Sequence, residues 1–210
     1  TETLFTAFRT RDPSILPFLY GPEVGRPMHL VSDAIRNFIM AGDRREFKVV
    51  DFASIEGRVN AWLADDDAKL EAFRASDRGE GPDLYKVAAA AIYTKRAEDV
   101  NGDERQTGKV AELALGYQGG VSALLSMAKG YGLKLDPAFP ALWEVSSDEL
   151  RERVEKRYAE CCERKEPATL ELTRYGWLTA ELVKIGWREG NQPIVDSWRL
   201  LEDGAWQAVA

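Results

Sequence analysis

Cysteine and histidine are nearly absent from this sequence. The only two cysteines, Cys161 and Cys162, are neighbours, so a disulfide between them would be strained, and no CxxC pair is available for zinc. We therefore expect two free thiols on a helix, in a reducing compartment. His29 is the sole histidine, which excludes a multi-histidine metal site and weakens any Ser-His hydrolase interpretation. We interpret it as a surface or half-buried side chain.

Long apolar runs and an excess of basic residues are also missing. No run approaches the ~20 residues of a membrane span, and residues 1–11 lack a signal-peptide pattern. We therefore expect a cytoplasmic protein of a bacterial or phage-infected cell. The net charge of −7 argues against a simple nucleic-acid coat protein, which would be basic. It is compatible with an enzyme that holds DNA in a local basic groove.

Helical periodicity is what the sequence does contain. Apolar residues recur at helical spacing over residues 30–40, 58–64, 68–75, 84–93, 104–118, 121–131, 146–162 and 187–209, the last broken near Pro193. Residues 170–182 fit either a hairpin or a helix. Residues 47–52, rich in β-branched and aromatic side chains, are the best candidate for a buried strand. The fold class predicted is mainly α (α+β).

Polar clusters between these segments are interpreted as caps and turns. The three acids at 65–67 would cap a helix rather than bind a metal. Ser146 and Glu149 form a capping-box pattern. Residues 101–103, Asn-Gly-Asp, predict a turn.

Asp51 ends the predicted strand, and Glu56 follows five residues later at the start of a helix. A strand end is a rigid place for a metal-binding carboxylate, and magnesium prefers one or two carboxylates plus substrate phosphates. Asp51 therefore suits phosphoryl transfer. An aspartate that merely caps the next turn is the alternative, which the local pattern alone favours.

A second group of residues recurs every four positions on one predicted helix: Arg105, Lys109, Leu113 and Tyr117. They would form a slanted stripe about 18 Å long, with cations at one end and an aliphatic and an aromatic side chain at the other. A nucleoside triphosphate has the same polarity. The commoner alternative is a helix with a charged first turn and a buried end. Gly108, which costs about 1 kcal/mol in a helix relative to Ala, hints at a close approach there.

Together these two groups resemble motifs A and B of family A DNA polymerases, most closely those of phages and prophages. Motif A of that family reads D-[YF]-S-x-I-E-x-R, and the matching residues are Asp51, Phe52, Ile55, Glu56 and Arg58, whereas Ala53 and Ser54 depart from the pattern. Motif B reads R-x3-K-x3-[FYL]-x3-Y and matches Arg105, Lys109, Leu113 and Tyr117. The resemblance extends from about residue 30 to the C-terminus.

The resemblance implies a role for each matching residue. Asp51, with the backbone carbonyl of Phe52, would bind two Mg²⁺ ions, and Glu56 would be a steric gate against the ribose 2′-OH. Arg105 and Lys109 would bind the triphosphate, with Lys109 also protonating the leaving pyrophosphate, so that Asp51 and Lys109 are the catalytic residues. The remaining residues would contact the substrates or support the site. Leu113 would pack on the sugar and base, and Tyr117 would lie near the templating base. Tyr85 would contact the phosphates, and Arg58 would be a structural support.

The same resemblance also predicts the domains and partners. Residues 1–53 would be a palm-proximal segment, and residues 54–210 a helical fingers subdomain with its connection back to the palm. The partners would be a DNA primer-template, a deoxynucleoside triphosphate and the rest of the polymerase, in cis or in trans. A His-Asp pair, the family's motif C, is absent, because the single His29 precedes Leu30.

Two interpretations of the chain stay open. The chain alone would be an incomplete DNA-directed DNA polymerase, whether a fragment, a shortened version or a subunit of a split enzyme. Alternatively, it would be a non-catalytic module that binds nucleotide or DNA. A single-subunit RNA polymerase is disfavoured, because a bulky Glu56 would exclude ribonucleotides.

Overall fold

The computed structural model describes residues 44–46, 48 and 50–209. The chain divides between Phe52 and Ala53 into a smaller unit, Thr1–Phe52, and a larger one, Ala53–Ala210. The helix predicted at residues 30–40, and His29 with it, lie outside the described residues. The identity of the two units as parts of a palm and a fingers subdomain stays a prediction.

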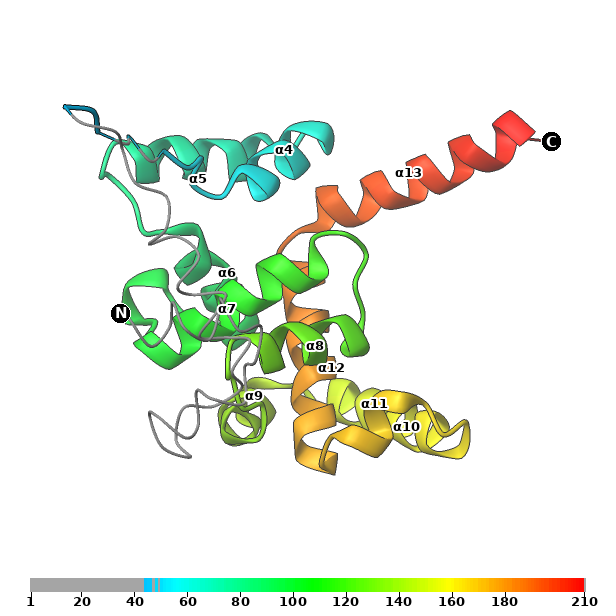
Figure 1. Cartoon of the computed structure of the whole chain (residues 1–210). Helices are drawn as coiled ribbons and strands as arrows, with labels where there is room; N and C mark the ends of the chain where they lie inside the picture. The colour runs from blue at the N-terminus through cyan, green and yellow to red at the C-terminus, as the bar shows by residue number, and fades with distance from the viewer. Residues whose placement is uncertain (1–43, 47, 49, 210) are drawn as a thin grey trace, which may run out of the picture. The chain divides into compact units, whose positions relative to one another are not determined.

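The described part of the larger unit is helical throughout (Figure 1). Its elements in chain order are α4 (Ile55–Leu63), α5 (Asp67–Asp77), α6 (Leu84–Tyr93), η3 (Ala97–Asp99), α7 (Gly102–Leu115), α8 (Val121–Gly130), η4 (Asp136–Ala138), α9 (Phe139–Val145), α10 (Asp148–Glu163), α11 (Pro167–Glu171), α12 (Arg174–Glu189) and α13 (Gln192–Val209). No helix among the described residues is both long and apolar enough to cross a membrane. The mainly α fold class is confirmed.

Side-chain caps explain where several helices begin. Asp66 accepts a hydrogen bond from the backbone N–H of Lys69 and so caps α5, which confirms the capping interpretation of the acids at 65–67. Asp83 caps α6 in the same way. Such caps satisfy the backbone donors that the first turn of a helix leaves free.

Helix α12 is at the centre of the core. Its buried side chains include Trp177, Leu178, Val183 and Trp187, none more than 2% exposed. The helix contacts α6, α7, α8, α9 and α10. Figure 1 shows α12 in orange among these elements, with α13 following it towards the C-terminus. Replacing a buried Trp with Ala typically costs about 3–5 kcal/mol, so these two indoles contribute much of the stability of the unit.

The strand predicted at residues 47–52 is not supported. Its described residues, Lys48, Val50, Asp51 and Phe52, are in no strand, and the side chains of Val50 and Phe52 are 84% and 75% exposed. β-Propensity reflects packing on a pleated surface, and the part of the chain that the structure describes offers no second strand to pair with.

Several boundaries also differ from prediction. Asn101 is not in a turn: it caps α7 and completes a capping box with Glu104, so Gly102 and Asp103 are already helical. Ser147, not Ser146, caps α10, because the Ser146 hydroxyl donates back to the carbonyl of Leu142. Residues 170–182, which fitted a hairpin or a helix, are largely helical, in α11 and α12.

Candidate functional site

Helix α7 carries three of the four residues in the predicted stripe. Arg105, Lys109 and Leu113 are one turn apart and half-buried. Tyr117 lies beyond Gly116, the C-terminal cap, and is 64% exposed. The helix does not continue past Gly116, since the backbone enters the left-handed region at Gln118, with φ of 62°, and Asn60 of α4 donates to the carbonyl of Gly116 at 2.7 Å. Tyr117 is therefore not part of one continuous helical stripe.

Gly108 marks the place where α6 approaches α7 most closely. A Cβ atom at this position would be 2.2 Å from the carbonyl oxygen of Tyr85 and 2.9 Å from the backbone nitrogen of Ala89. Only glycine avoids these clashes without moving a backbone. The close approach that the sequence hinted at is real, and its partner is a neighbouring helix. It fixes Tyr85 relative to the cations of α7.

Arg105 is held in place from α6. Its Nε donates to Asp83 Oδ2 at 2.9 Å, and its guanidinium carbon lies 5.3 Å from the centroid of the Tyr85 ring. The other carboxylate oxygen of Asp83 caps α6. The two terminal nitrogens of Arg105 make no hydrogen bond to any described group. The guanidinium is thus oriented and still has donors for an anion.

Lys109 lies over the ring of Tyr131, with Nζ 4.6 Å from the ring centroid. A cation over an aromatic face is attracted by the ring quadrupole, which restrains an otherwise flexible ammonium. The Lys109 ammonium forms no ion pair with any described acid. Its position therefore depends on Tyr131.

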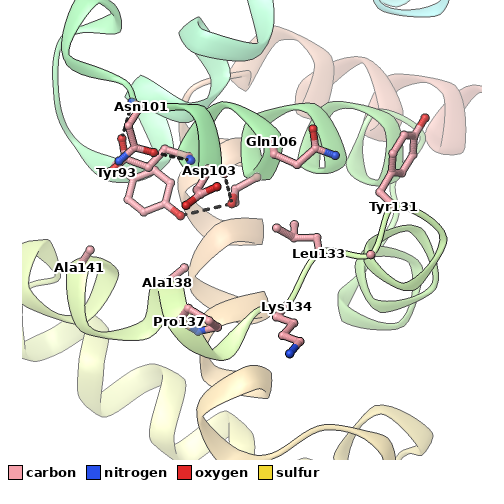
Figure 2. Close-up of a pocket in the computed structure, with 13 residues that line it drawn as sticks. Tyr93, Asn101, Asp103, Gln106, Tyr131, Leu133, Lys134, Pro137, Ala138 and Ala141 are labelled. Atoms are coloured by element: carbon pink, nitrogen blue, oxygen red, sulfur yellow. Dashed lines mark hydrogen bonds between the residues drawn. The ribbon is translucent and has the colours of Figure 1, made fainter.

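Tyr131 also lines a pocket of about 560 Å³ between α6, α7 and residues 131–141. Figure 2 shows Tyr131 at one end of this pocket and Tyr93 and Asp103 at the other. The Tyr93 hydroxyl donates to Thr107 at 3.4 Å, and burial raises its pKa above the ordinary value. Tyr131 thus contacts Lys109 and also lines this pocket.

Glu56 and Tyr117 lie close enough to interact electrostatically. Glu56 is exposed in the first turn of α4. The pKa of the Tyr117 phenol is raised, first by partial burial and then by the negative charge of Glu56. The hydrogen bond from Asn60 to the carbonyl of Gly116 joins α4 to the end of α7, so the two motifs lie on elements that contact each other.

Arg58, one turn after Ser54, is part of the frame of α4. Its guanidinium binds both carboxylate oxygens of Asp77 at 2.7 and 2.8 Å, and its Nε donates to the carbonyl of Ala53 at 2.9 Å. This hydrogen bonding raises the pKa of Arg58 and lowers that of Asp77. The geometry agrees with the structural role expected for Arg58.

Asp51 and Phe52 belong to the smaller unit, and both are exposed. Within the described ranges, no three or more His, Cys, Asp or Glu side chains are grouped so that they could hold a metal ion. Asp51 makes no hydrogen bond or ion pair with a described residue, and a carboxylate beside a backbone carbonyl fits a magnesium ion that takes its other ligands from phosphates and water. The metal-binding role of these residues stays a prediction.

On another face of α7, a nearly buried ion pair ties the helix to its neighbours. Lys69 Nζ of α5 is 2.9 Å from both carboxylate oxygens of Glu112, and the side chains are 9% and 12% exposed. Asn191 accepts a third hydrogen bond from Lys69 at 2.6 Å, and the Trp187 indole donates to Glu112 at 3.0 Å. Every N–H of the ammonium is satisfied.

Sequence reasoning missed three contributors to this arrangement: the Asp83 contact with Arg105, the Tyr131 contact with Lys109, and the Lys69–Glu112 pair. Asp83 had a visible signal, an acid directly before an apolar run, but that signal predicts only a cap. Tyr131 and Lys69 contact residues 22 and 43 positions away. No local pattern could have found them.

Comparison with known proteins finds similarity to DNA polymerases. The chain is 39% identical over 105 residues to the DNA polymerase of Bacillus phage SP02. It is 30% identical over 128 residues to DNA polymerase I of Aquifex aeolicus, and 34% identical over 100 residues to DNA polymerase I of Pseudomonas aeruginosa. No family model and no solved structure matches the chain.

The similarity to these DNA polymerases supports the family A resemblance. The relatives of the chain are polymerases of a phage and of two bacteria. The matches cover 49%, 59% and 48% of this chain, in the same order, but only 15%, 20% and 10% of the relatives. The chain thus corresponds to a small part of each of them.

Proposed function

We propose that this chain is the nucleotide-binding part of a DNA-directed DNA polymerase, which adds a deoxynucleoside monophosphate to a primer 3′-OH under the direction of a template. The observation that supports this most is the oriented Arg105 on α7, one turn before Lys109, in a chain whose relatives are DNA polymerases. The deoxynucleoside triphosphate and the primer-template are the substrates proposed.

Arg105 and Lys109 bind the triphosphate in this proposal. Arg105 keeps its Nε on Asp83 and offers its two terminal nitrogens to phosphate oxygens, while Tyr85 supports the guanidinium from one face. Lys109 acts as a point charge and gives a proton to the departing pyrophosphate. Leu113 packs against the sugar and base. Tyr117 stacks near the templating base.

Asp51 and the carbonyl of Phe52 would hold two magnesium ions, which neutralise charge on the triphosphate and favour ionisation of the primer hydroxyl when bound. Asp51 thereby anchors the reacting phosphate. Glu56 occupies the space beside the sugar and leaves no room for a 2′-OH. The charge interaction between Glu56 and Tyr117 is consistent with one shared pocket.

Nucleotide binding is the first test. Arg105→Ala/Lys109→Ala should abolish the thermal stabilisation that a deoxynucleoside triphosphate gives to the parent chain. The matched control, Lys156→Ala/Arg164→Ala, removes the same charge from α10 and its C-terminal cap and should respond like the parent. Equal stabilisation of the parent and the Arg105/Lys109 variant would show that other residues bind the nucleotide.

Sugar selection tests the role of Glu56 once the chain is joined to the rest of a polymerase. Glu56→Ala should raise the efficiency of ribonucleotide incorporation relative to deoxynucleotide incorporation. The ratio of the two kcat/KM values, parent against variant, measures this effect. An unchanged ratio in a folded variant would assign Glu56 a structural role.

The second candidate function is a nucleotide- or DNA-binding module without activity of its own, or a subunit of a split polymerase. The cations Arg105 and Lys109 on α7 would suffice for such binding. Primer extension by the chain, alone and with a polymerase palm and thumb supplied in trans, distinguishes the polymerase from the binding module. We expect negligible synthesis by the chain alone. Robust synthesis that depends on Asp51 would contradict that expectation.

A further inference from the structure

A groove of about 410 Å³ runs where α10, α12 and α13 meet. Its apolar lining comes from Val154 of α10, Ile185 of α12 and Val195 of α13, one from each helix. None of its lining residues belongs to the α7 stripe. The groove is therefore separate from the proposed nucleotide site.

Cations dominate the rim of this groove, although the chain as a whole carries a net charge of −7. Its charged lining residues are five cations and two acids: Arg153, Arg157, Lys184, Arg188 and Arg199 against Glu181 and Glu189. The lining itself has an excess of three positive charges, while acids outside it lie beside two of these cations: Glu160 and Glu166 beside Arg157, and Asp196 beside Arg199. A local basic surface on an acidic protein is the electrostatic signature of polyanion binding.

Internal ion pairs neutralise only part of this charge. Lys184 is fully engaged with Glu181, at 2.6 and 2.7 Å. Arg157 lies 3.6 and 3.8 Å from its two acids, too far for short charge-assisted hydrogen bonds. Arg153 forms no ion pair with any acid that the structure describes. On α10, Arg153 is therefore available to a ligand, and Arg157 is held only by its two longer ion pairs.

Arg188 is also without an acidic partner in the described part of the chain. It donates to the carbonyl of Gly119 at 3.1 Å and lies 5.7 Å from the centroid of the Trp198 ring, while its buried Nε has no hydrogen-bond partner among the described groups. Arg188 as a whole is half-buried, but a buried N–H without an acceptor is costly, and an anion in the groove would offset that cost.

The arrangement of the cations fits a strand of phosphates. Arg153 and Arg157 are one turn apart on α10, and Lys184 and Arg188 are one turn apart on α12. The groove thus has two rows of cations with an apolar floor between them. Four of its five cations are arginines, whose planar fork matches phosphate. None of the residues that line the groove is aromatic, and the one described ring in contact with a groove cation is that of Trp198, against Arg188.

We propose that this groove binds the phosphate backbone of single-stranded DNA, as a second nucleic-acid contact apart from the nucleotide site. The inference rests on the proposed function, because the template of a polymerase includes an unpaired strand. The groove between α10, α12 and α13 would be the surface that holds that strand.

Fluorescence anisotropy of a labelled single-stranded oligodeoxythymidine, titrated with the full chain at several salt concentrations, tests the proposal. Arg153→Ala/Arg199→Ala should weaken binding about tenfold at low salt and reduce the slope of log K against log[salt] by about 1.4, for two lost phosphate contacts. The control, Arg96→Ala/Arg164→Ala, removes equal charge outside the groove. Both double variants remove one arginine in an i,i+3 pair with an aspartate, and the control should bind like the parent.

Three results would overturn the proposal: equal loss of binding in the groove variant and the control, tighter binding of duplex than of single strand, and competition by polyglutamate as strong as that by oligodeoxythymidine of the same charge. Equal competition by inorganic phosphate, at the same phosphate concentration, would also overturn it, because the groove would then hold a free ion. The groove variant should keep its thermal response to nucleotide. Failure of the Arg105/Lys109 test with an intact groove effect would reject the nucleotide site alone.

Discussion

The ion pair between Lys69 and Glu112 offers the sharpest test of the structure. Lys69→Met removes an ammonium that donates to three oxygen atoms, two on Glu112 and one on Asn191. Glu112, with a side chain only 12% exposed, would keep one hydrogen bond, from the Trp187 indole. Removing one partner of a buried pair typically costs about 3–5 kcal/mol, because the other charge stays buried. A loss of that size is a large part of the about 5–15 kcal/mol that stabilises a domain.

A second variant separates a lost attraction from a stranded charge. Lys69→Met/Glu112→Gln keeps an oxygen acceptor for the Trp187 indole but removes the uncompensated carboxylate. It should therefore be more stable than Lys69→Met alone, since replacing both members of a buried pair is often nearly neutral. The assay is urea unfolding followed by tryptophan fluorescence and circular dichroism. Arg96→Met, at an exposed pair with Asp99, should leave the unfolding midpoint close to that of the parent.

Two outcomes would refute this reasoning. If Lys69→Met costs less than about 1 kcal/mol, the pair behaves like a surface pair and α5 is not anchored to α7 as described. If the double variant is no more stable than the single one, the cost does not come from a stranded Glu112 carboxylate.

Two further predictions concern packing. Gly108→Ala should destabilise the chain by about 3 kcal/mol in urea unfolding, because its Cβ would clash with the backbone of α6. The control Gly102→Ala, with no neighbour within 4 Å, should be neutral or stabilising. A similar effect of both substitutions would contradict the contact between α6 and α7. A thiol reagent should modify Cys162 at once and Cys161 only after unfolding, because Cys161 is 1% exposed and burial raises the pKa of its thiol. Mass spectrometry should thus find one modified thiol in the native chain and none in Cys162→Ser; prompt modification of both thiols would contradict the burial of Cys161.

The helices could be predicted because their signals are local. The range 84–93 was expected and observed, since Asp83 caps its start and Thr94 ends it in the left-handed region, with φ of 52°. The stretch at 47–52 had an equally clear β pattern, yet its described residues are exposed and in no strand. A strand depends on a partner that the local sequence does not contain.

The candidate site divides in the same way. The common helix of Arg105, Lys109 and Leu113 follows from spacing alone, because α-helical geometry brings every fourth residue to one face. The contacts that orient two of these side chains, from Asp83 and Tyr131, join separate helices and loops. They could not be read from spacing. These contacts from Asp83 and Tyr131 also determine whether Arg105 and Lys109 are oriented to bind a ligand.

A second row with the same four-residue spacing, Gly108, Glu112 and Gly116, comes one position before Lys109, Leu113 and Tyr117. Gly108 packs against the backbone of α6, Glu112 binds Lys69 of α5 and Trp187 of α12, and Gly116 accepts a hydrogen bond from Asn60 of α4. This row consists of two glycines and a paired acid, and its contacts reach four helices. The neighbouring row of cations is only half-buried. Helix α7 therefore has one face that is fixed by its surroundings and one that stays accessible, which is the arrangement a preorganised anion site requires.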